Sequence, residues 1–138
     1  MTAQNVYVPQ RHVTDNLGGC ARDIYDFSIH GGAIGTITMP LTTPDNAIIT
    51  ECIVDVLTDP TSTGSATIAL GLNTTTDLLA ATAIASVTGI VVAKEQAAAF
   101  KLTAERNLQL TIATAALTAG KLAVYLKWAG AYDDITSR

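Results

Sequence analysis

The side chains that could bind a metal are few and scattered. His12 and His30 are the only two histidines, and neither lies in a cysteine or carboxylate pattern of the kind that zinc sites use. His30 precedes two glycines, where a loop histidine needs no special role. Asp133 and Asp134 are adjacent near the C-terminus, but two carboxylates supply fewer oxygens than the six or more that calcium takes. We therefore expect neither a metal nor a cofactor.

The residues that could catalyse a reaction do not form a catalytic pattern either. Asp23 and Asp26 are three residues apart in a predicted strand, so they lie on opposite faces and cannot act as a carboxylate pair. No serine lies in a G-x-S-x-G elbow. The run from Gly31 to Thr36 (G-G-A-I-G-T) lacks the lysine and helix that follow a phosphate-binding loop, which favours a turn between strands. The sequence predicts no enzyme.

Three aromatic residues, Tyr25, Tyr125 and Trp128, could stack on a sugar. Trp128 shares its predicted strand face with Leu122 and other apolar residues, so we expect it in the core. Tyr125 and Lys127 point to the opposite face. These two residues are therefore predicted to contact another subunit.

The clearest structural signal runs from Lys101 to Trp128. Apolar residues alternate with polar or small ones in two runs, Leu108 to Ile112 and Leu122 to Trp128. A period of two places one strand face in a core. The Thr118-Ala119-Gly120 connection between the runs predicts an antiparallel hairpin with a buried side.

Alternation and turn residues predict further strands before this region. They are Ile24–Ile29, Ile34–Met39 (ended by Pro40), Ala47–Thr58 and Ala66–Leu72. In the third, Ile48, Cys52 and Val54 are expected on one face, with Ile49 and Ile53 on the other.

The segment after these strands contains the one predicted helix. Thr76 or Asp77 could cap a short helix that runs through Ile84. Residues 87–99 are ambiguous, with a possible strand at Ile90-Val91-Val92 followed by a loop.

These elements predict an all-β fold: an antiparallel β-sandwich of jelly-roll or Greek-key type with one short helix. Residues 1–19 are expected to form an N-terminal extended arm, 20–130 the sandwich domain and 131–138 a C-terminal tail. The apolar residues of the arm, Val6, Tyr7, Val8 and Val13, are predicted to pack on a neighbouring subunit.

Composition excludes several classes of function. The net charge is −4, and the eight Lys and Arg residues are not clustered, so direct nucleic-acid binding is not expected. The N-terminus lacks the layout of a signal peptide, and no apolar run is long enough to span a membrane. Cys20 and Cys52 are too few for a disulfide framework, although they leave a single bridge open. Only 14% of residues are charged, which suits a subunit that hides surface in an assembly.

Four segments carry a resemblance to a known family. They are Asn46–Thr58 (N-A-I-I-T-E-C-I-V-D-V-L-T), Gly64–Leu72 (G-S-A-T-I-A-L-G-L), Leu78–Ser86 (L-L-A-A-T-A-I-A-S) and Lys101–Trp128. In this order they are similar to small proteins encoded in the structural-gene regions of tailed bacteriophages, which resemble head decoration (capsid cement) proteins. The resemblance spans about Ile34 to Trp128 and consists of strand and turn patterns. It transfers no individual functional residue.

The resemblance implies a homotrimeric β-sandwich that is made in the host cytoplasm and resides on the outer capsid surface of the virion. There it would bind the major capsid protein and stabilise the lattice against DNA pressure. The alternative is an adhesion module, namely a head-fibre, tail or carbohydrate-binding domain. Its binding loops would be Thr61–Gly64 and Thr74–Thr76.

Overall fold

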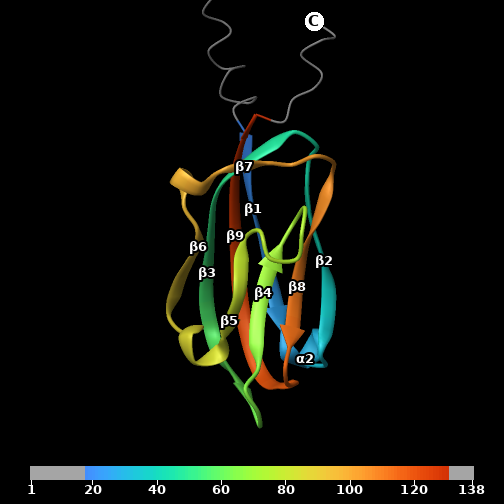
Figure 1. The fold of residues 1–138 in the computed structure, drawn as a ribbon, viewed down its shortest axis with the longest axis vertical. Helices are drawn as coiled ribbons and strands as arrows, with labels where there is room; N and C mark the ends of the chain where they lie inside the picture. Colours follow the sequence, from blue (N-terminus) through green and yellow to red (C-terminus); the bar gives the residue numbers. More distant parts are fainter. Residues whose placement is uncertain (1–17, 131–138) are drawn as a thin grey trace, which may run out of the picture.

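The computed structural model describes residues 18–130, which form two β-sheets packed face to face (Figure 1). The β1 sheet contains, in order, β1 (Gly18–Asp26), β9 (Leu117–Gly130), β3 (Ala47–Ser62) and β6 (Ile90–Lys94), with β7 (Phe100–Lys101) also pairing with β3. The β2 sheet contains β2 (Gly35–Thr43), β8 (Arg106–Ala113), β4 (Thr67–Gly71) and β5 (Leu79–Ala83). The connections include α2 (Phe27–His30), η2 (Ile84–Ser86) and η3 (Gln96–Ala98). The predicted all-β sandwich with one short helix is confirmed.

Strand pairing identifies the sandwich as a jelly roll. β1 pairs with β9, β2 with β8, β3 with β6 and β7, and β4 with β5, all antiparallel. The chain therefore has the connectivity of one long hairpin with β4 and β5 at its tip. Rolling this hairpin brings β3 beside β9 and β4 beside β8, which completes both sheets.

The hairpin predicted between Leu108 and Trp128 is wrong in its pairing, although its buried faces are right. β8 and β9 belong to opposite sheets, and Leu110 of one and Leu126 of the other are buried in the same core. The chain changes sheet at Thr114–Ala116, and Thr114 has a φ of +74°. The predicted turn at Thr118-Ala119-Gly120 lies inside β9. A strand that faces a partner across the core has the same alternation as a strand beside it, so the pattern could not distinguish the two.

The two faces predicted for β3 exchange partway along the strand. Ile49 lies opposite Trp128 and Glu51 opposite Lys127, which leaves Thr50 as an extra residue. This β-bulge turns Ile49 inward and Ile48 outward, while Cys52 points inward. Ile48 and Cys52 therefore lie on opposite faces, which corrects the expectation that they share one.

The helix predicted from Thr76 or Asp77 through Ile84 is wrong. Its residues form a turn, then β5, then η2. Asp77 binds the preceding turn: its carboxylate accepts backbone N–H groups of Leu72, Asn73 and Thr74 at 2.7, 2.9 and 3.1 Å. Pairing of β5 with the buried β4 overrides the helix propensity of its alanines. In the ambiguous region, the strand at Ile90 is present as β6.

Two strand ends also differ from expectation. The predicted strand Ile24–Ile29 stops at Asp26, because the carboxylate of Asp26 accepts the backbone N–H of Ser28 at 2.9 Å and caps α2. Ile29, expected in a strand, lies on α2 and is 76% exposed. β2 continues past Pro40 to Thr43 through an irregular stretch of the β2–β8 ladder.

Candidate protein interface

The outer face of the β1 sheet carries a row of apolar side chains on β9, β3 and β6, with Arg22 of β1 at its end. The ladders place Arg22 of β1 beside Tyr125 of β9, Tyr125 beside Ile53 of β3, and Ile53 beside Val92 of β6. Tyr125 is 40% exposed and Val92 is 54% exposed. Ile90, two residues before Val92, is 63% exposed. An exposed apolar surface shared by several strands is typical of a protein contact.

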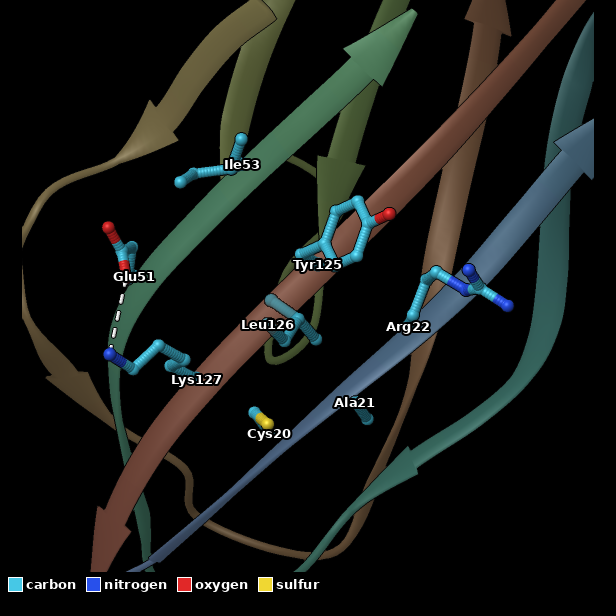
Figure 2. Close-up of a pocket in the computed structure, with 8 residues that line it drawn as sticks. All are labelled: Cys20, Ala21, Arg22, Glu51, Ile53, Tyr125, Leu126 and Lys127. Atoms are coloured by element: carbon cyan, nitrogen blue, oxygen red, sulfur yellow. Dashed lines mark ion pairs between the residues drawn. The ribbon is translucent and has the colours of Figure 1, made fainter. Parts of the chain in front are cut away.

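A shallow groove of about 550 Å³ lies on this face over β1, β9 and β3. Figure 2 shows the ring of Tyr125 between Ile53 on one side and Arg22 on the other. Cys20 lines the end nearer the start of β1. We call this the β1-sheet groove; its lining residues are Cys20, Ala21, Arg22, Glu51, Ile53, Tyr125, Leu126 and Lys127.

An ion pair lies at the side of the groove. Lys127 Nζ is 3.7 Å from Glu51 Oε1, and the two residues are cross-strand neighbours (Figure 2). Both side chains are well exposed, so the pair contributes at most about 1 kcal/mol. The groove therefore has an apolar floor and, at its side, a charged margin formed by this pair. An apolar centre with a polar rim is the composition expected of a protein interface.

The structure brings together the two sandwich residues predicted to contact a subunit, because Tyr125 and Lys127 both line the groove. Trp128 points inward and packs against the core, as expected. The other predicted contact residues, Val6, Tyr7, Val8 and Val13, lie outside the described residues, as do Asp133 and Asp134.

Sequence reasoning missed six of the eight lining residues, and Cys20, Arg22 and Ile53 are three of them. These three come from β1 and β3, which are far from β9 in the sequence and meet it only through the roll of the sheet. The mixed outer face of β3, with apolar Ile53 beside acidic neighbours, was the available signal.

The two cysteines are free and have opposite environments. Cys20 is exposed in the groove, whereas Cys52 is buried in the core. Burial raises the pKa of the Cys52 thiol to about 12, with Lys94 acting weakly in the other direction. The single bridge that the sequence left open is not formed.

His30 and Tyr25, which the sequence analysis considered for metal or sugar binding, instead make contacts that stabilise the fold. The ring of His30 stacks on Tyr25 at 5.6 Å between centroids, and its Nδ1 accepts the backbone N–H of Asp26 at 3.0 Å. The Tyr25 hydroxyl donates to the Gly31 carbonyl at 2.6 Å, and burial followed by the charge of Asp26 raises the pKa of Tyr25. Within residues 18–130 no three His, Cys, Asp or Glu side chains gather as a metal site. No helix in that range is long and apolar enough to cross a membrane.

Comparison with known proteins gives a structural likeness without a sequence match. Neither a family model nor a curated protein matches the chain. A chain in the acidic stable capsid structure of Helicobacter pylori bacteriophage KHP30 aligns with a TM-score of 0.62 and 11% identity, over 84% of this chain and 90% of that one.

Two further capsid structures align similarly. A chain in the capsid of Ralstonia phage GP4 has a TM-score of 0.60 and 22% identity, over 86% of this chain and 89% of that one. A chain in the capsid asymmetric unit of cyanophage Pam1 has a TM-score of 0.59 and 17% identity, over 82% and 86%. At these identities the likeness establishes a shared fold.

Proposed function

We propose that this protein is a decoration, or cement, subunit of a tailed-bacteriophage head. In this proposal a homotrimer binds the outer capsid surface and braces neighbouring copies of the major capsid protein. The observation that carries it is the likeness to chains in three phage capsid structures. Because the alignments cover most of both chains, those capsid chains are, like this one, single sandwiches of similar length.

The physical role follows from mass action. A protein that binds the assembled lattice and not its dissociated parts stabilises the lattice by an amount set by its concentration and affinity. A trimer engages several capsid sites at once, so each contact can be modest. Charge-poor sandwiches with exposed apolar rows are suited to such contacts, because little charge must be desolvated on binding.

The β1-sheet groove supports a protein partner better than a glycan. Tyr25 is buried and Trp128 packs on the core, so Tyr125 is the one exposed large aromatic within residues 18–130. A single ring does not provide the stacked platform expected for the adhesion alternative. We assign Tyr125 and Lys127 to the contact with a neighbouring subunit or the capsid.

The test combines mass and capsid binding. We expect the purified chain to have a native mass about three times its 14.3 kDa and to co-sediment with heads assembled from a phage major capsid protein. Tyr125→Asp should reduce head occupancy because it places a charge in the apolar row. Thr38→Asp, an exposed change on β2 of the opposite sheet, is the matched control. A monomer that ignores heads but binds a glycan array would favour the adhesion alternative.

The N-terminal arm is proposed as a second contact, through Val6, Tyr7, Val8 and Val13. Removing residues 1–17, which precede β1, should abolish head binding while the sandwich retains its thermal unfolding transition. Unchanged occupancy on heads would remove the arm from the proposal without affecting the groove.

A further inference from the structure

The β1-sheet groove lies close to the point where the N-terminal segment joins the sandwich. Gly18, the first residue of β1, pairs with Ala129, and Cys20 in the groove follows two residues later. Gly18 has a φ of +141°, and a Cβ there would lie 1.9 Å from the Trp128 carbonyl oxygen. The backbone at this joint therefore has a conformation that only glycine adopts readily.

The segment before Gly18 is long enough to reach the groove after reversing direction. From Gly18 to Arg22, the far row of the groove, a strand advances about 13 Å. Val8 lies ten residues before Gly18, and a chain of that length spans at most about 33–36 Å. About 20 Å of this span remains for the turn and for crossing from β1 towards β3.

We propose that the β1-sheet groove is the binding site of this chain's own segment Val6-Tyr7-Val8. In an extended segment alternate side chains share a face, so Val6 and Val8 would enter the groove against Ile53 and Tyr125 while Tyr7 faces outward. The chemistry matches, because the groove floor is apolar and the three-residue segment carries no charge.

The occupant is assigned to the same chain because of tethering. A segment joined to its site by a linker of about ten residues has an effective concentration of the order of millimolar, which exceeds that of a second copy at micromolar concentration. This proposal concerns the free protein, so it can fail while the capsid role stands, and the reverse also holds.

Cys20 provides a direct test, since its thiol is exposed in the groove. In the full chain, Val8→Cys should form an intrachain disulfide with Cys20 in oxidised glutathione, about tenfold faster than Thr2→Cys forms one. Peptide mapping after non-reducing digestion identifies the bond, and Val8→Cys combined with Cys20→Ser is the blank. Equal rates for the two variants would overturn the proposal. A faster bond that links different chains would overturn it as well, because it would assign the groove to a neighbour's segment.

A second measurement uses the unmodified thiol. Docked Val6 and Val8 should shield Cys20 from iodoacetamide, so the double variant Val6→Asp/Val8→Asp should be alkylated several-fold faster than the native chain. Thr2→Asp should react at the native rate. Identical rates in all three proteins would show that nothing covers the groove and would overturn the proposal.

Discussion

The backbone N–H of Leu41 in β2 donates a 2.9 Å hydrogen bond to Oδ2 of Asp23 in β1, which links the edges of the two sheets. Leu41 lies where the β2–β8 register shifts between Thr38 and Thr42, so its N–H has left the regular ladder. The nearby Met39 carbonyl likewise accepts from Asn107 Nδ2 at 3.0 Å. Side chains thus satisfy the backbone groups that the irregular stretch around Pro40 leaves unpaired.

Asp23→Ala should therefore destabilise the sandwich by about 1.5–3 kcal/mol, because it leaves a buried-edge N–H without its charged acceptor. Amide hydrogen exchange should show the Leu41 proton losing protection first. Asp23→Asn, which retains a carbonyl oxygen, should lose less. Unchanged protection at Leu41 in the alanine variant would contradict this account.

Asp77 should be equally sensitive, because its carboxylate accepts three consecutive backbone N–H groups of the turn before it. We expect Asp77→Ala to lower the free energy of unfolding by about 2–4 kcal/mol, measured by urea denaturation. Thr76→Ala is the neighbouring control and should change little, since Thr76 is exposed. If Asp77 were a helix N-cap, Ser, Thr or Asn could replace it with little loss of stability. A loss in Asp77→Ser close to that in Asp77→Ala would therefore show that Asp77 acts as the acceptor of three N–H groups and not as a cap.

The two thiols should differ in reactivity. Cys52 is fully buried with its pKa raised to about 12, whereas Cys20 is exposed. A disulfide reagent at pH 8 should therefore titrate one thiol per chain in the native protein and two in denaturant. Cys20→Ser should abolish the thiol that reacts in the native protein. Cys52→Ser should abolish only the thiol that reacts in denaturant. Two fast native equivalents would contradict the buried placement of Cys52.

Asp26 should contribute to acid sensitivity. Donation from the Ser28 hydroxyl, then from the Ser28 backbone N–H, holds the pKa of Asp26 below its ordinary 3.8, with smaller help from Lys121. Because the folded pKa is the lower one, the ionised carboxylate stabilises the folded state fully above about pH 5, and this stabilisation is lost as the pH falls through the folded value.

Two variants check this acid dependence. Ser28→Ala should raise the pKa of Asp26, followed by the NMR titration of its carboxyl carbon. Asp26→Asn should lose less stability than the native protein between pH 5 and pH 2. An equal loss in both proteins would show that Asp26 plays no part.

The amino-acid sequence by itself determined the β-sandwich class and much of the core. Alternation along Leu108–Ile112 and Leu122–Leu126 depends only on the two-residue period of a strand, so those inward residues could be identified without knowing their partners. It also placed Tyr125 and Lys127 on an outward face together, because residues two apart share a side.

Only the tertiary structure decided how the strands pair and what lies in the groove. β8 and β9 bury the same kind of face whether they are neighbours or face each other across the core, so pairing depends on the whole roll. The bulge at Thr50 reverses the faces of β3 through one unpaired residue. The alternation of residue types in the sequence does not reveal where this residue lies. The groove combines Cys20, Ile53 and Tyr125, and long-range strand pairing alone makes them neighbours.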